Sequence, residues 1–258
     1  MSTTWHWVYE LSQFGPFLTS QYLYWIVWAH HSLDTTAVGL FTKCFPVLAL
    51  LFYVLNNEWP RAKRPFLLRI AAGLAVSCVA DAVIQHEELF LAGVGLFGVA
   101  QFSYILAFGF ERRRPLLAVP LLVFGASVLS KVIPSVDDAV LKVALLLYGA
   151  LLLVMAWRAL AFSTSNAGFL TGAGGVLFMV SDSFIALDKF HRPMENPRLY
   201  IMSTYYAAQF LITLSCVEIF VSAAAKKNER EKERGKEVER SGENLNVKGR
   251  TKRAKKAK

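Results

Sequence analysis

The sequence predicts an all-α membrane protein, built as a bundle of about eight transmembrane helices. Apolar side chains make up 55% of the 258 residues and charged ones 18%, whereas a soluble domain is usually about a quarter charged. The charge is also segregated: residues 226–258 hold fourteen Lys and Arg against six Glu, which leaves +8 of the net +9 in that segment. Nearly neutral apolar stretches followed by a basic tail indicate a membrane protein rather than a nucleic-acid-binding one.

Eight stretches are apolar and long enough, at about 17–25 residues, to cross a bilayer. The first is the least hydrophobic, because it contains Gln21 and His30. We still expect it to direct insertion itself, since residues 1–13 lack the basic start and the cleavage site of a signal peptide. The expected spans are 14–31, 38–56, 65–84, 89–110, 115–133, 139–160, 169–187 and 199–223.

Basic residues predict the orientation of the spans. Loops 57–64 and 111–114 each hold three Lys or Arg, and they alternate with loops 32–37, 85–88 and 134–138, which contain acidic residues and no Lys or Arg. Because Lys and Arg are enriched in cytosolic loops, the basic loops and the basic tail are expected on the cytosolic side. An even number of spans then places both termini in the cytosol.

The predicted organisation has three parts. Residues 1–13 form a short cytosolic segment, residues 14–225 the eight-helix transmembrane domain, and residues 226–258 a basic cytosolic tail that we expect to be disordered. The tail ends in Lys255-Lys256-Ala257-Lys258, which matches the dilysine pattern of endoplasmic-reticulum retrieval signals. A tail so rich in lysine could also produce this match by chance, so an endoplasmic-reticulum location is an expectation.

A small set of polar side chains lies inside the spans. Ionisable groups there cost a few kcal/mol on insertion scales and are functional candidates by default. At a rise of 1.5 Å per residue, Asp81, Asp182 and Lys43 all lie about 5–8 Å from the non-cytosolic ends of their helices. Scattered structural groups have no reason to share one half of the bilayer, so this layer predicts a site. The polar residues that accompany the three are Gln101, Tyr104, Tyr205, Tyr206 and Gln209.

The two aspartates also hint at an internal duplication. When Asp81 is aligned on Asp182, Gly73 falls on Gly174, although common features of membrane helices could explain this similarity. A true duplication would give two four-helix repeats of the same orientation and bring the aspartates to equal depth.

Structural roles are the alternative for each of these residues. An aspartate near a helix end could pair with Lys43 or reach the interface, and Lys43 itself could extend its amine to the membrane surface. The histidines lie near loop edges without metal-ligand spacing, so a zinc site is not favoured. Several glycines are better explained as close-packing positions between helices than as catalytic ones. They are Gly93, Gly95, Gly98, Gly172, Gly174 and Gly175.

Five segments of the chain, between about residues 35 and 220, closely resemble the lysoplasmalogenase family, YhhN-like membrane hydrolases of the transmembrane protein 86 type. The most specific are Gly172-Ala-Gly-Gly-Val-Leu-Phe-Met-Val-Ser-Asp-Ser-Phe-Ile-Ala-Leu-Asp-Lys-Phe190 and Pro197-Arg-Leu-Tyr-Ile-Met-Ser-Thr-Tyr-Tyr-Ala-Ala-Gln-Phe-Leu-Ile212. Looser matches are Thr42-Lys-Cys-Phe-Pro46, Gly73-Leu-Ala-Val-Ser-Cys-Val-Ala-Asp81 and Met155-Ala-Trp-Arg-Ala159.

The resemblance implies an enzyme with eight spans. It implies hydrolysis of the vinyl ether bond of lysoplasmalogens to a fatty aldehyde and glycerophosphoethanolamine or glycerophosphocholine, without a metal or organic cofactor. The family's two intramembrane aspartates match Asp81 and Asp182. The chain departs from the family at Ala80, where Gly is usual, and at Gln101, where His is usual. The second change removes a titratable group, so that group is either not essential or its loss makes this member slower or different in substrate.

A vinyl ether opens once a proton adds to its β-carbon and water captures the resulting oxocarbenium ion. This chemistry needs one neutral carboxylic acid and one carboxylate, the division of roles found in glycoside hydrolysis, and two aspartates in a poorly solvated site can supply both. We expect Asp81 and Asp182 to be catalytic, although the sequence does not say which is the acid.

The other polar residues are expected to bind substrate or water. Lys43 could hold a carboxylate ionised or bind the lipid phosphate, and Tyr205, Tyr206 and Gln209 could orient water or the glycerol hydroxyl. The partners expected are a lysophospholipid and the bilayer, not nucleic acid. Two other functions stay open: a proton-coupled transporter of small molecules or lipids, because intramembrane carboxylates are typical of transporters too, and a non-catalytic lysolipid-binding member of the family.

Overall fold

The computed structural model describes residues 12–30, 36–57, 59, 61–111, 114–162, 168–217, 230–231 and 233–234. The chain divides into two units, Met1–Glu218 and Ile219–Lys258, and the four described residues of the second unit are helical. The cytosolic segments predicted at 1–13 and 226–258 lie almost entirely outside the described residues. Their boundaries therefore stay predictions.

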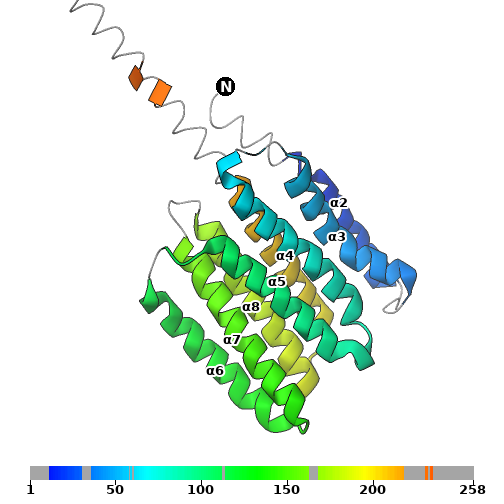
Figure 1. Ribbon diagram of the computed structural model, residues 1–258. Coiled ribbons are helices and arrows are strands. Elements are labelled where there is room, and N and C mark those ends of the chain that lie inside the picture. Colours follow the sequence, from blue (N-terminus) through cyan, green and yellow to red (C-terminus); the bar gives the residue numbers. More distant parts are fainter. Residues whose placement is uncertain are drawn as a thin grey trace, which may run out of the picture. The chain divides into compact units, whose positions relative to one another are not determined.

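The first unit is an all-helical bundle, and its described residues contain no strand (Figure 1). The seven helices labelled there are α2 (Gly15–His30), α3 (Ala37–Asn56), α4 (Arg64–Val83), α5 (Phe90–Phe108), α6 (Ala118–Val132), α7 (Ala139–Phe162) and α8 (Gly168–Phe190). Residues 197–217 form an eighth, which we call the last helix. Short 3₁₀ turns stand at Arg61–Lys63, Glu87–Leu89, Pro115–Leu117 and Ile133–Ser135.

This architecture confirms the predicted polytopic membrane bundle. Within the described residues, six helices, α3 to α8, are long and apolar enough to cross a membrane. The described helices follow the eight expected spans to within three residues, and the predicted end of the eighth span, at residue 223, lies outside the described residues. One difference is in α8. It continues to Phe190 instead of ending near residue 187, so Asp182 lies eight residues, about 12 Å, from the helix end.

Local sequence explains where several helices begin and end. The Thr36 hydroxyl caps α3 by accepting from the Gly39 backbone N–H, and a carboxylate oxygen of Asp138 accepts from Leu141 N–H at the start of α7. Pro65 occupies the first turn of α4, where its missing N–H is no loss. Gly109 ends α5 with a φ of 65°, a conformation that favours glycine.

Consecutive helices pack side by side along most of the chain. α3 packs on both α2 and α4, α4 packs on α5, and α7 packs on α6, α8 and α5. α6 lies at the edge of the bundle (Figure 1), and only Leu121 and Val132 of this helix are buried. The edge position leaves most of α6 available to lipid.

The last helix lies at the centre of the bundle. Its Phe210 ring packs on Phe14 and Phe17 beside α2, and its Tyr206 hydroxyl donates to the α3 backbone. Next to α8, its backbone approaches so closely that a Cβ at Gly174 would lie 3.0 Å from the Ala208 carbonyl oxygen. Burial among α2, α3 and α8 explains how this span tolerates several polar residues that would be costly against lipid.

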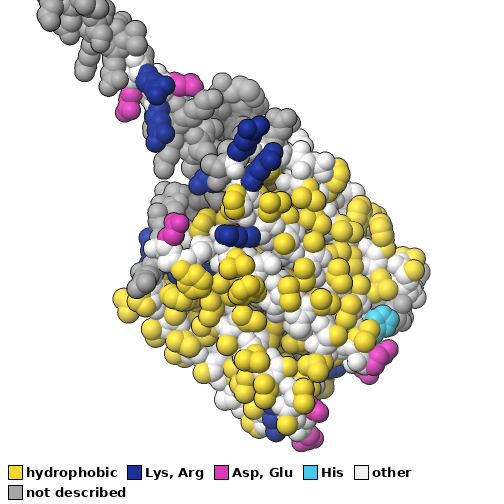
Figure 2. All heavy atoms as spheres, viewed as in Figure 1, with side chains coloured by type: hydrophobic (Ala, Val, Ile, Leu, Met, Phe, Trp, Pro, Cys, Tyr) yellow, Lys and Arg dark blue, Asp and Glu magenta, His cyan; other side chains and the backbone are white. Residues whose placement is uncertain are grey.

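The surface of the bundle matches a membrane environment. Figure 2 shows hydrophobic side chains over its flank, with charged side chains mainly at its two ends: Lys and Arg are prominent where α4 begins, and Asp and Glu, with some Lys or Arg, at the opposite end. The basic end includes the exposed residues Arg61, Lys63 and Arg64, and the opposite end includes Glu87 and Glu88. An apolar flank between two polar ends is what a bilayer-spanning protein requires.

Candidate functional site

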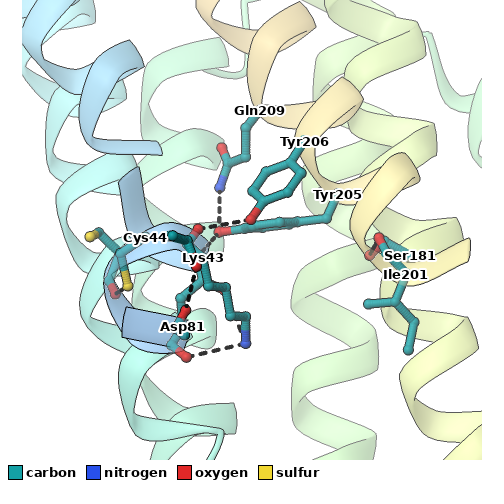
Figure 3. Close-up of polar contacts among 11 residues, drawn as sticks. Lys43, Cys44, Asp81, Ser181, Ile201, Tyr205, Tyr206 and Gln209 are labelled. Atoms are coloured by element: carbon teal, nitrogen blue, oxygen red, sulfur yellow. Dashed lines mark hydrogen bonds and ion pairs between the residues drawn. The ribbon is translucent and has the colours of Figure 1, made fainter. Parts of the chain in front are cut away.

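Asp81 lies in the last turn of α4 and is the centre of a buried polar cluster (Figure 3). Its side chain receives a cation from α3, with Lys43 Nζ 3.7 Å from Oδ1, and a hydrogen bond from the last helix, where the Tyr205 hydroxyl donates to Oδ2 at 2.6 Å. Lys43 Nζ also donates to the Asp81 backbone oxygen at 3.2 Å. A carboxylate at 2% exposure thus has a partner for each oxygen, as a buried charge requires.

A chain of hydrogen bonds extends from Asp81 into the centre of the bundle. Tyr205, which donates to Asp81, accepts from Gln209 Nε2 at 3.3 Å, and Gln209 Oε1 accepts from the Tyr104 hydroxyl at 2.8 Å. These hydrogen bonds join α4, α5 and the last helix. The Tyr104 ring fits because position 73 is Gly: a Cβ there would lie 2.2 Å from Tyr104 Cε1.

Tyr206 takes part in a different way from its neighbour. Its hydroxyl donates to the backbone oxygen of Lys43 at 2.8 Å, so it links the last helix to α3 at Lys43. Its ring also packs on Tyr24 of α2 at 5.3 Å between centroids. Tyr206 therefore positions the Lys43 backbone and does not contact either aspartate through a described hydrogen bond.

Asp182 lies on α8 and has different partners from Asp81. The Tyr148 hydroxyl, from α7, donates to its Oδ2, and within the described residues Asp182 makes no ion pair with Lys or Arg. It is 9% exposed and lies within electrostatic range of Asp81. The structure thus brings the two aspartates into one region but surrounds them differently, Asp81 by a cation and Asp182 by a tyrosine.

Tyr148 is the residue that sequence reasoning missed. It lies in the middle of an apolar span, and its only signal was a polar atom inside 139–160. Tyrosine is common in membrane helices, so that signal alone does not separate it from residues at the interface.

Gln101, on α5, is fully buried, and neither its amide nitrogen nor its amide oxygen has a hydrogen-bond partner among the described residues. The amide lies close to the Tyr148 side chain, which connects it with the Asp182 side of the site. A buried amide without partners costs about 1–3 kcal/mol. A group kept at such a cost is a candidate for contact with water or substrate.

Two cavities open near the aspartates, at the end of the bundle where α4 and α8 finish, which we call the site end. The larger has a volume of about 440 Å³ and is lined by the ends of α2, α4 and α8 and the starts of α3, α5 and the last helix, including Lys43. The smaller, of about 40 Å³, is mostly apolar and is lined by Asp182 and Tyr148. Ile84, Phe90 and Ile185 line both cavities, so these adjoin.

Among the described residues, the cysteines make no hydrogen bond to either aspartate. All three cysteines are free: Cys44 and Cys216 are buried, Cys78 is half-buried, and Cys44 Sγ donates to the Cys78 backbone oxygen at 3.5 Å. Through the described ranges, no group of three His, Cys, Asp or Glu side chains could hold a metal ion. The glycines divide, because a Cβ would clash at Gly93, Gly172 and Gly175 but would meet nothing within 4 Å at Gly95.

Comparison with known proteins gives one consistent result. The model of the YhhN family matches residues 38–216, from the start of α3 to the last helix. The chain is 35% identical to human lysoplasmalogenase TMEM86B over 205 residues, which cover 79% of this chain and 85% of that protein. It is 33% identical to bovine lysoplasmalogenase TMEM86A over 212 residues, which cover 79% and 88%. No solved structure matches the chain.

Proposed function

Because this chain belongs to the YhhN family, we propose that it is a membrane-embedded lysoplasmalogenase, an ether-bond hydrolase that acts on lysophospholipids. The substrate is a lysoplasmalogen, and the products are a fatty aldehyde and glycerophosphoethanolamine or glycerophosphocholine. The observation that carries the mechanism is the contrast between two neighbouring aspartates, one paired with Lys43 and one held by Tyr148 without a cation.

In the proposed reaction, a carboxylic acid transfers a proton to the β-carbon of the vinyl ether. The π electron pair of the double bond forms the new C–H bond, a C–C single bond remains, and the positive charge is shared by the α-carbon and its ether oxygen. Water adds to the α-carbon and loses a proton, which gives a hemiacetal. The hemiacetal collapses when its hydroxyl loses a proton and the glycerol oxygen gains one, releasing aldehyde and alcohol. One water molecule is consumed, and the acid recovers its proton.

Asp182 is the general acid in this scheme. A protonated carboxyl keeps one oxygen as an acceptor while the other carries the proton. The Tyr148 hydroxyl occupies Oδ2, so Oδ1 is left to carry the proton. Asp182 also lines the smaller cavity, which lets a reacting carbon approach it. Burial without a cation favours the neutral form that an acid needs.

Asp81 is the carboxylate. Lys43 and Tyr205 both stabilise its ionised form, so it can steady the oxocarbenium charge and receive the proton of the attacking water. Gln101 can hold that water, because its amide offers a donor and an acceptor and lies near Tyr148. Tyr104 and Gln209 act at a distance, by fixing the direction of the Tyr205 hydroxyl.

The proposed location is the endoplasmic-reticulum membrane, with both termini in the cytosol. The basic loops at the start of α4 and after α5 support this orientation, as does the dilysine pattern at residues 255–258. The site end would then face the lumen. Glycosylation acceptors inserted beside Glu88 and beside Lys63 test the topology: only the first should be modified.

The test of the activity is a pair of substrates. Protein purified in detergent is incubated with an alkenyl lysophosphoethanolamine and with its saturated alkyl ether analogue, and aldehyde is measured. Aldehyde from the first lipid alone is the expected result. Because detergent removes any gradient, a proton-coupled transporter would give none, and a non-catalytic lysolipid-binding protein would bind both lipids without releasing aldehyde.

A further inference from the structure

The larger cavity at the site end carries charges of both signs. Its wall includes the cations Lys43, Lys189 and Arg198 and the carboxylates Glu87 and Asp188. Its volume of about 440 Å³ lies in the range of about 300–1,000 Å³ that is usual for small-molecule sites. A purely anionic or purely cationic ligand would meet repulsion on part of this wall. A ligand with one charge of each sign would not.

We propose that this cavity binds the zwitterionic phosphodiester headgroup of the lysolipid, with the phosphate against Arg198 and Lys43 and the amine against Glu87. This assignment rests on the proposed function for the identity of the lipid. It adds the cavity and the residues that select ethanolamine or choline over a phosphate without an amine.

All three cations already have contacts within the protein, and they differ in the geometry that they offer a phosphate. Lys189 Nζ lies 4.6 Å from the centroid of the Phe90 ring, so it belongs to a cation–π contact on the cavity wall. Lys43 shares its charge with Asp81. Arg198 presents a planar guanidinium, whose fork of N–H donors fits a phosphate bidentately. Arg198 is therefore the main phosphate ligand, and Lys43 the second.

The two carboxylates differ as well. Oδ1 of Asp188 accepts from the Met194 backbone N–H at 2.7 Å, which uses it to hold the turn after α8. Glu87 is exposed, and its carboxylate makes no hydrogen bond or ion pair with any residue that the structure describes. Its carboxylate is available to an ammonium group in the cavity. Trp28 lines the same cavity and adds an aromatic side chain to its wall.

The position of the headgroup agrees with the chemistry. Lys43 lines the larger cavity and contacts Asp81, while Ile84, Phe90 and Ile185 separate that cavity from the smaller one beside Asp182. A headgroup in the larger cavity places the glycerol at this shared wall. The vinyl ether is then directed toward Asp182, and the hydrocarbon chain continues along the apolar wall of the smaller cavity.

Binding of a lipid that cannot react tests the phosphate site. The probes are hexadecyl ether lysophosphoethanolamine and hexadecylglycerol, which lacks the phosphate, and dissociation constants are measured in detergent by titration calorimetry. Arg198→Ala should weaken binding of the first probe by about 10–100-fold, as expected for a lost charge-assisted hydrogen bond, and leave the second unchanged. Arg192→Ala is the matched control, since Arg192 is exposed nearby but does not line the cavity.

A charge test addresses the amine. Glu87→Gln should weaken binding of the ethanolamine probe by about 2–5-fold, the range for an exposed ion pair, and tighten binding of hexadecylglycerol phosphate, which has no amine. Glu88→Gln, outside the cavity wall, should change neither. The proposal is overturned if Arg198→Ala weakens both of its probes equally, or if Glu87→Gln leaves the dissociation constants of both phosphate probes unchanged.

These binding results separate this inference from the proposed reaction. If the parent protein binds the ether lipids with the expected pattern but releases no aldehyde from the alkenyl lipid, the catalytic proposal fails and the headgroup site stands. If aldehyde is released and the binding pattern is absent, the enzyme stands and the headgroup assignment fails.

Discussion

Gly73→Ala tests whether the hydrogen-bond chain behind Asp81 depends on close packing. An added Cβ would lie 2.2 Å from Tyr104 Cε1 and 2.6 Å from Cζ, both well inside van der Waals contact. Tyr104 is fully buried, so its ring has no open space to move into. Overpacking of this kind costs about 1–3 kcal/mol. For a domain of this size, that corresponds to a melting temperature lower by about 2–12 °C.

Gly95→Ala is the matched control, because Gly95 also lies inside a membrane helix but a Cβ there meets nothing within 4 Å. Replacing a helical glycine by alanine without a clash gains about 0.5–1 kcal/mol, so its melting temperature should equal or exceed that of the parent. The assay is thermal unfolding of both variants in the same detergent. Equal melting temperatures for the two variants would refute the packing argument.

Gly73→Ala should also lower the catalytic rate. Movement of Tyr104 disturbs its bond to Gln209, and through Tyr205 it disturbs the orientation of Asp81. Aldehyde release measured well below the melting temperature separates this effect from unfolding. Gly95→Ala should keep the parent rate.

Three further predictions concern the aspartates and Gln101. Tyr148→Phe removes the donor to Asp182 and should lower the aldehyde rate about 10–100-fold, the value of a hydrogen bond to the charged carboxylate that Asp182 becomes as it gives up its proton. The melting temperature should change little, and an unchanged rate would remove Tyr148 from the site. Lys43→Gln leaves the buried Asp81 charge without a cation and should destabilise the protein by several kcal/mol. The double variant Lys43→Gln with Asp81→Asn removes both charges, so its melting temperature should return close to that of the parent protein while its activity stays lost. Gln101→Leu removes an amide without hydrogen-bond partners, so it should raise the free energy of unfolding by about 1–3 kcal/mol and lower the rate of aldehyde release. A variant that is more stable and fully active would show that Gln101 holds no catalytic water.

The bundle and the position of its ionisable residues could be predicted from the sequence. Apolar runs of spanning length give the helices, and the cost of a charge in lipid singles out Asp81, Asp182 and Lys43. Counting residues from the helix ends was enough to place Lys43 near Asp81, and the structure has them 3.7 Å apart. The internal duplication is not tested by these contacts and stays a prediction.

The partners of each aspartate could not be predicted, because they depend on how each helix is rotated. α7 is apolar on all sides, so no periodicity indicates that Tyr148 faces Asp182. The link from Tyr104 to Gln209 joins residues 105 positions apart and depends on the small size of Gly73. The central place of the last helix was visible only as an unusual number of polar residues in one span.

The central claim is that Asp182 delivers a proton to carbon, and label transfer from solvent measures this step. The parent protein and Asp182→Asn, each shown to be folded by its melting curve, are incubated in deuterium oxide with alkenyl lysophosphoethanolamine, and the aldehyde is analysed by mass spectrometry. The account predicts one deuterium on the carbon next to the carbonyl with the parent and no aldehyde above background with Asp182→Asn. Aldehyde without deuterium, or undiminished aldehyde from the variant, would contradict it.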